Sequence, residues 1–99
     1  METFNEAIST DQLVLVDFFA TWCQPCKMMH PVLEETKHML GDRIRIIKVD
    51  IDKHPDRASA YRVQSVPTLM LFRNGELLWR QSGVLSRADL MATLDPFLK

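Results

Sequence analysis

The sequence is poor in the features that mark several classes of protein. Its 99 residues include only two cysteines and three glycines, and nowhere do lysines and arginines cluster as nucleic acid or anionic membranes require. The longest apolar run near the N-terminus, residues 13–16, is far too short to span a bilayer. No internal repeat, linker or low-complexity tract is present. We therefore expect a single domain over residues 1–99 that binds neither nucleic acid nor membrane.

The first residues lack the cationic start and long apolar core of a secretory signal peptide. A cytoplasmic location is the default expectation for such a start, although a mature chain whose leader had been removed would look the same. In a reducing compartment, two cysteines separated by two residues favour a redox-active or metal-binding role over a structural disulfide.

The hydrophobic pattern predicts four strands. Residues 13–19 are apolar at both odd and even positions, as expected of a central strand covered on both faces. Residues 44–51 form a second such run, which a right-handed helical crossover would place parallel to the first. Residues 68–73 and 76–81 flank the hairpin dipeptide Asn74-Gly75 and are therefore predicted to be antiparallel.

Helix caps and apolar spacing predict four helices. The first follows Thr3 with Glu6 completing a capping box, the third falls within residues 52–61, and the last begins after Ser86. The second starts at the cysteines and ends at Gly41, with a kink expected at its internal Pro31. Its predicted buried stripe is Met29, Val32, Leu33, Thr36, Met39 and Leu40. The sequence thus predicts an α/β domain in which a mixed sheet carries helices on both faces.

The run Trp22-Cys23-Gln24-Pro25-Cys26 falls at the junction between the central strand and the second helix. At a helix N-terminus, unpaired backbone donors and the helix dipole favour a thiolate, so Cys23 is the predicted nucleophile. Cys26, one turn further in, is the predicted resolving thiol that attacks a mixed disulfide. Pro25 suits the first helical turn and stiffens the ring that the two sulfurs can close.

Two other interpretations of the cysteines remain open. Cys23, Cys26 and His30 have the spacing of three zinc ligands, but a structural zinc site needs a fourth ligand, and no second pair at ligand spacing occurs. Alternatively, the two thiols could be buried as small hydrophobic groups.

The order and spacing of several motifs resemble the thioredoxin family over about residues 4–98. The motifs are Val16 to Met28, which includes both cysteines, then Pro31, Val49-Asp50-Ile51-Asp52, Val66-Pro67-Thr68-Leu69, Asn74-Gly75 and Gly83. The resemblance implies a thioredoxin-like fold and a protein dithiol–disulfide oxidoreductase.

The resemblance also implies roles for residues around the cysteines. Asp17 would be the buried acid that exchanges a proton with Cys26, and Lys48 would lie beside it. Pro67 would follow a cis peptide bond and face the thiols, leaving the Val66 backbone free to pair with an extended substrate. A docking surface for the target would include Trp22, Gln24, Pro25, Gly83 and Val84.

Each of these residues also has a plainer interpretation. Asp17 could be a structural, hydrogen-bonded acid, Lys48 a lysine that extends to solvent, Trp22 a core residue, and Gly83 an ordinary turn glycine. We expect the aromatic residues Phe18, Phe19 and Phe72 to lie in the core, and His38 and His54 to lie at the surface. His30, just before Pro31 in the cysteine helix, could lie near the site, although we expect it to be solvated.

The sequence departs from the family pattern at three places. Gln24 stands where thioredoxins usually have glycine, and Phe19 where they commonly have tryptophan. Almost nothing precedes Phe4, where a first strand is usual, so we predict four clear strands with the N-terminal one missing or vestigial. The sheet edge left open is one through which two copies could pair, although we expect a monomer.

The expected function is reduction of disulfides in target proteins through Cys23 and Cys26. No bound cofactor or metal is expected. A thioredoxin reductase would restore the dithiol with electrons from NADPH. Two alternatives remain: a disulfide oxidase or isomerase of an exported compartment, and a non-catalytic module that uses the cysteine loop for docking.

Overall fold

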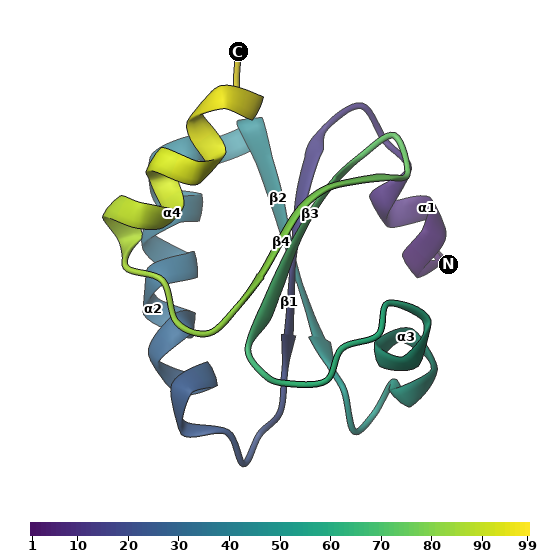
Figure 1. The fold of residues 1–99 in the computed structure, drawn as a ribbon. Coiled ribbons are helices and arrows are strands. Elements are labelled where there is room, and N and C mark those ends of the chain that lie inside the picture. The colour runs from purple at the N-terminus through teal and green to yellow at the C-terminus, as the bar shows by residue number, and fades with distance from the viewer.

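A computed structural model describes residues 1–99 as four strands and four α-helices (Figure 1). The elements are α1 (Phe4–Ile8), β1 (Leu13–Phe19), α2 (Gln24–Leu40), β2 (Ile44–Asp50), α3 (Pro55–Ala60), β3 (Thr68–Arg73), β4 (Glu76–Ser82) and α4 (Arg87–Leu94). Two 3-10 turns, Gly41–Arg43 and Asp95–Phe97, follow α2 and α4. The predicted mixed sheet of four strands is confirmed. None of the helices is both long and apolar enough to cross a membrane.

The strand order is β2-β1-β3-β4, which places β1 and β3 in the middle of the sheet. β1 and β2 are parallel, with Leu13 opposite Ile44 and Asp17 opposite Lys48. β3 is antiparallel to both β1 and β4, as predicted for the hairpin. The carboxyl ends of β1 and β2 therefore lie at the same end of the sheet as the segment before β3 and the carboxyl end of β4.

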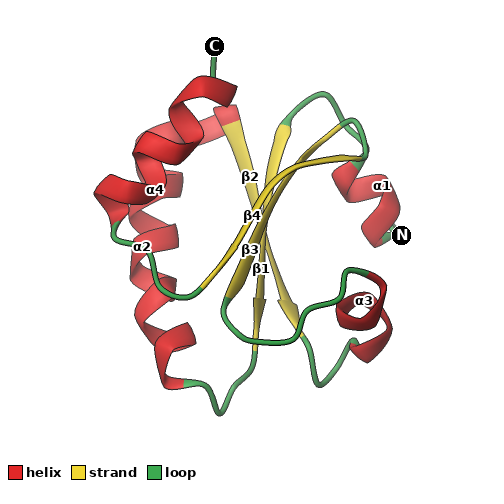
Figure 2. Cartoon of the chain, in the orientation of Figure 1, coloured by secondary structure: helices red, strands yellow, loops and turns green.

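Helices α2 and α4 cover one face of the sheet, and α1 and α3 cover the other (Figure 2). Because side chains alternate along a strand, the two faces of β1 enter different cores. The core beneath α2 and α4 contains Leu13, Leu15, Met29, Leu33, Leu40, Ile44, Leu69, Leu71, Leu85, Leu90 and Leu94. The opposite core contains Ile8, Val14, Val16, Phe18, Val49, Met70 and Phe72. Burial of residues 13–18 on both faces explains the apolar character of β1 at odd and even positions, whereas Phe19, which we expected in the core, is only partly buried.

The helix caps act as predicted. Thr3 and Glu6 form a capping box at α1, and the Ser86 hydroxyl accepts the Asp89 N–H at the start of α4. Near its C-terminus, α4 gives way to a 3-10 turn that contains Pro96, since proline cannot supply the backbone donor that an α-helix needs.

Helix α2 runs without interruption through Pro31 and ends at Gly41. Gly41 has a φ of 56°, a value that glycine adopts at little cost. Met39, which was predicted to lie in the buried stripe, is instead 49% exposed. It is adjacent to Leu40, which is the residue that turns into the core at this end of the helix.

Candidate active site

The two cysteines form a disulfide at the beginning of α2. Cys23 is the N-cap residue, and its sulfur accepts a hydrogen bond from the Cys26 N–H at 3.1 Å. Cys26 is completely buried, whereas Cys23 keeps 5% of its surface exposed. Of the two sulfurs, the one at the helix start is thus the one a partner can reach.

This capping position determines the chemistry available to Cys23. The first N–H groups of a helix have no partner within the helix, and the positive end of the helix dipole lies there. In the dithiol form these groups stabilise negative charge on sulfur, and the thiolate is the nucleophilic form of cysteine. Gln24 and Pro25, which separate the cysteines, are both exposed beside the disulfide.

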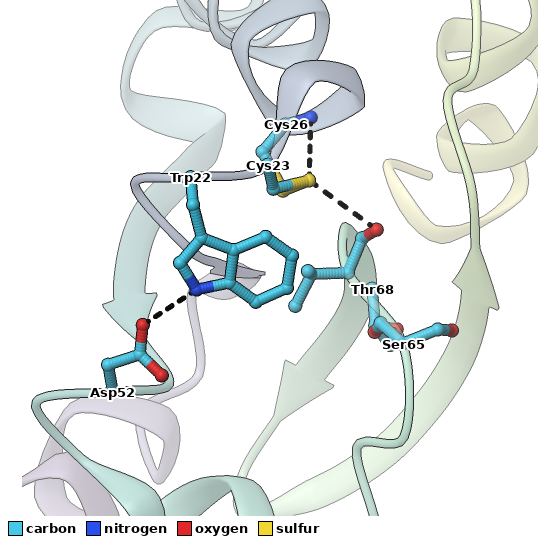
Figure 3. Close-up of a disulfide and its surroundings, with 7 residues drawn as sticks. Trp22, Cys23, Cys26, Asp52, Ser65 and Thr68 are labelled. Atoms are coloured by element: carbon cyan, nitrogen blue, oxygen red, sulfur yellow. Dashed lines mark hydrogen bonds between the residues drawn. A yellow bond between two sulfur atoms is a disulfide. The ribbon is translucent and has the colours of Figure 1, made fainter.

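The segment before β3 lies opposite Cys23 (Figure 3). The Val66–Pro67 peptide bond is cis, as the resemblance implied. The Cys23 sulfur lies 3.6 Å from the Val66 carbonyl oxygen. The Thr68 hydroxyl contacts the Ser65 carbonyl oxygen at 2.7 Å and the Ser82 hydroxyl at 2.8 Å, and so fixes this segment against β4.

Trp22 is 67% exposed, which excludes a role as a core residue. Its indole N–H donates a 2.9 Å hydrogen bond to the carboxylate of Asp52 (Figure 3). The loop that carries Asp52 is held in turn by Asp50, whose carboxylate accepts the Asp52 and Lys53 N–H groups. The ring is therefore held beside the cysteines while its faces remain open to a partner.

Asp52 was not among the residues we predicted for the site. A signal for it was present, because Trp22 follows β1 and Asp52 follows β2 at nearly the same distance. The carboxyl ends of neighbouring parallel strands meet at one edge of a sheet, so such residues are placed close together.

The last predicted part of the rim, Gly83 and Val84, follows β4. The Gly83 N–H donates to the Pro67 carbonyl oxygen at 2.9 Å, which joins this turn to the segment opposite Cys23. Gly83 has a φ of 96°, where a side chain would be strained. Val84 is 41% exposed. The predicted docking residues thus surround the disulfide on one edge of the sheet.

Asp17 lies behind the cysteines in β1 and is completely buried. Neither of its carboxylate oxygens has a hydrogen-bond partner within the protein. Burial raises the pKa of Asp17 from 3.8 to about 6, and the positive charge of Lys48 opposes part of that rise.

Lys48 faces the same side of the sheet as Asp17 but forms no ion pair with it. The lysine is exposed and lines a groove of about 280 Å³ between α2 and β2. The Lys48 side chain is thus exposed to solvent, and its positive charge lowers the pKa of Asp17.

His30 differs from the solvated residue that we expected. Its Nδ1 atom is buried without a hydrogen-bond partner in the protein, and its ring packs edge-on against Phe19 with 5.6 Å between centroids. His38 is exposed as predicted, whereas His54 is partly buried. No group of three or more His, Cys, Asp or Glu side chains in the structure could hold a metal ion.

A disulfide that caps a helix and faces a cis-proline segment is suited to exchanging electrons with other disulfides. This disulfide and the mixed sheet that carries it are the defining features of the thioredoxin-fold dithiol–disulfide oxidoreductases. The Thioredoxin family model matches residues 1–96, and the chain belongs to the thioredoxin family.

Individual relatives agree with this assignment. The chain is 47% identical to a thioredoxin-like protein of Synechocystis over 85 residues, which cover 86% of the chain and 81% of the relative. It is 43% identical to a thioredoxin of Acidithiobacillus ferridurans, with 92% and 84% of the two chains covered. It is 41% identical to a thioredoxin of Rickettsia typhi, with 88% and 83% covered. The protein is a disulfide reductase of the thioredoxin type that works through its own redox-active disulfide.

Proposed function

We propose that the protein reduces disulfides in target proteins with Cys23 as the nucleophile and Cys26 as the resolving thiol. The Cys23 thiolate attacks one sulfur of the target and releases the other as a thiolate, which leaves a mixed disulfide. Cys26 then loses its proton and attacks the Cys23 sulfur, breaking the mixed disulfide. The target gains two electrons, and the protein is left with the Cys23–Cys26 disulfide.

The observation that carries this assignment is the hydrogen bond from the Cys26 N–H to the Cys23 sulfur at the start of α2. It selects Cys23 for the charged, attacking role. Complete burial of Cys26 suits a thiol that only needs to reach its neighbour.

Asp17 is proposed to accept the proton of Cys26 in the second step. With its pKa raised to about 6, Asp17 is mainly ionised at pH 7 yet basic enough to take up a proton. Lys48 is proposed to keep Asp17 ionised between turnovers through its charge.

The exposed rim is proposed to bind the target. An extended peptide would pair with the Val66 backbone, while Trp22 and Val84 supply apolar contacts on either side. Gln24, Pro25 and Gly83 complete the exposed surface, and Pro67, which is itself buried, holds the Val66 segment opposite Cys23.

Return to the dithiol requires two electrons, which we assign to a thioredoxin reductase that uses NADPH. We further propose a cytoplasmic location and a monomeric state. The edge strand β2 carries Arg45 and Lys48, and such charges discourage pairing between sheet edges.

Reduction of insulin by dithiothreitol tests the proposal. The parent chain should accelerate the reaction, Cys23→Ser should give no acceleration, and Cys26→Ser should accumulate a mixed disulfide detectable by mass spectrometry. A folded parent without acceleration would refute the proposed activity. Trapping by Cys23→Ser instead of Cys26→Ser would reverse the two roles.

A further inference from the structure

The face of α2 that follows the cysteines contains an ionisable residue with no role in the mechanism above. Cys26, His30, Leu33 and Lys37 succeed one another at spacings of three and four, so they share one face of the helix. Side chains on a helix lean toward its N-terminus. The imidazole of His30 therefore leans toward the turn that carries Cys26.

The surroundings of the His30 ring join it to the cysteines. Its edge packs against Phe19, with an angle of 78° between the two rings. Phe19 in turn packs against the buried cluster of Ala20, Cys23 and Cys26. The His30 Nδ1 atom is turned inward and buried without a partner, while the residue as a whole remains partly exposed. The ring thus lies between the protein interior and solvent.

The sheet beneath this part of α2 is polar. Asp17 lies two residues before Phe19 and hence on the same face of β1, and Lys48 lies opposite Asp17 on β2. The only buried side-chain nitrogen or oxygen atoms without a partner in the whole protein are the two Asp17 oxygens and His30 Nδ1. These atoms belong to β1 and to α2, and the contact of the His30 ring with Phe19 brings the two elements together two residues from Asp17.

The charges around His30 keep it neutral at pH 7. Burial and the positive charge of Lys48 lower the pKa of His30 below 6.5, and Glu34 on the next turn of α2 partly opposes them. A neutral imidazole can accept a proton on one nitrogen while it donates from the other.

Asp17 has no exposed surface through which to pass a proton directly to water. We propose that His30 carries the proton from Asp17 to solvent after Asp17 has taken it from Cys26. This inference rests on the proposed function and adds a positioning residue that acts through Asp17. In the resolving step, the Cys26 S–H bond breaks, its electron pair forms the bond to Cys23, the target leaves as a thiolate, and the proton passes through Asp17 and His30 to water.

Stopped-flow oxidation of the reduced protein by 5,5′-dithiobis(2-nitrobenzoate) separates the two steps. Attack by Cys23 releases the first coloured thiolate, and attack by Cys26 releases the second. The reagent concentration is set so that the first release is complete before the second begins. For His30→Ala we expect an unchanged first release and a second release slowed about tenfold, a modest share of what proton transfer contributes to catalysis. Imidazole in the buffer should restore the second rate.

The matched control is His38→Ala, which removes an exposed histidine from the same helix and should behave as the parent. A second variant, His30→Gln, keeps a polar side chain but cannot titrate. Its second release should be slowed as in His30→Ala, while the inflection that Asp17 gives near pH 6 is retained.

The outcomes distinguish this inference from the function on which it rests. If the parent releases both thiolates normally and His30→Ala matches it at every pH, His30 has no role in proton transfer. A slowed His30→Ala variant that imidazole does not restore would show a structural role and would also overturn the inference. A parent that neither reduces insulin nor releases the second thiolate would overturn the proposed function, and the inference with it.

Discussion

The even-numbered residues of β1 pack into a core with no charged member, whereas the odd-numbered residues place Asp17 between Leu15 and Phe19. Residues 13–18 are buried on both faces and only Phe19 is partly exposed, so the main difference lies in what each face contributes. Ring contacts among Phe4, Tyr61 and Phe72 support the apolar face. The face beneath α2 contains a carboxylate whose burial costs free energy. One face stabilises the fold, and the other gives up stability for a proton-accepting group behind the cysteines.

The largest effect is expected on the apolar face. Phe72→Ala removes a side chain that is 1% exposed and packs against Tyr61, so the free energy of unfolding should fall by about 3–5 kcal/mol. The loss should be equal at pH 5 and pH 8, and insulin reduction by the folded fraction should be unchanged. Urea unfolding at both pH values measures it.

Should Phe72→Ala be too unstable to purify, Phe72→Leu gives a smaller loss with the same independence of pH. A change in the rate of insulin reduction by either folded variant would break the proposed division between the two faces.

Replacing Asp17 should raise the free energy of unfolding, whereas replacing Phe72 should lower it. The pKa of Asp17 rises from 3.8 to about 6 on folding, so the native state binds more protons than the unfolded state between these values. Stability contributed by the protonated acid is therefore present below about pH 4 and is lost as pH rises through 6. Asp17→Asn should raise the free energy of unfolding at pH 8 by up to about 3 kcal/mol and change it little at pH 4.

Urea unfolding of the disulfide form at pH 4, 6 and 8 checks this expectation, and the exposed Asp11→Asn is the matched control. The same Asp17 variant should slow the resolving step with Cys26. Equal stabilisation at pH 4 and pH 8 would contradict the assigned cause.

The smallest effect concerns Lys48, whose charge lowers the pKa of Asp17 without forming an ion pair. Lys48→Met should raise that pKa by about half a pH unit, an interaction of roughly 0.7 kcal/mol as expected for an exposed lysine. The carboxyl carbon of Asp17, followed by NMR during a pH titration, gives the value directly. Lys53→Met, in the loop after β2, should leave the titration in place.

Much of the fold could be predicted because the same residues determine both local and global structure. The continuous apolar run over 13–19, the Asn74-Gly75 turn and the caps at Thr3 and Ser86 each depend on neighbours in sequence. They predicted β1 and both helix starts correctly. Met39 was placed on the wrong side because a spacing of three or four residues does not fix where the buried stripe ends.

The parts of the site that could be predicted are those whose position depends on residues nearby in the sequence. Cys23 and Cys26 could be placed at a helix start from their spacing after the strand, and the cis bond before Pro67 required the family resemblance. The Trp22–Asp52 hydrogen bond depends on the ends of two strands meeting, and the burial of His30 depends on how α2 packs over Phe19. Such contacts between distant segments leave no pattern in neighbouring residues.

Because Cys23 is both the reacting group and the N-cap of α2, each chemical step changes the first hydrogen bond of the helix. A thiolate is a stronger acceptor than a sulfur bonded to another sulfur. The bond from the Cys26 N–H should thus be strongest in the dithiol form and weaker in the mixed disulfide. The Cys26 amide proton is consequently a natural reporter of redox state, whose exchange with deuterated water records how far turnover has advanced.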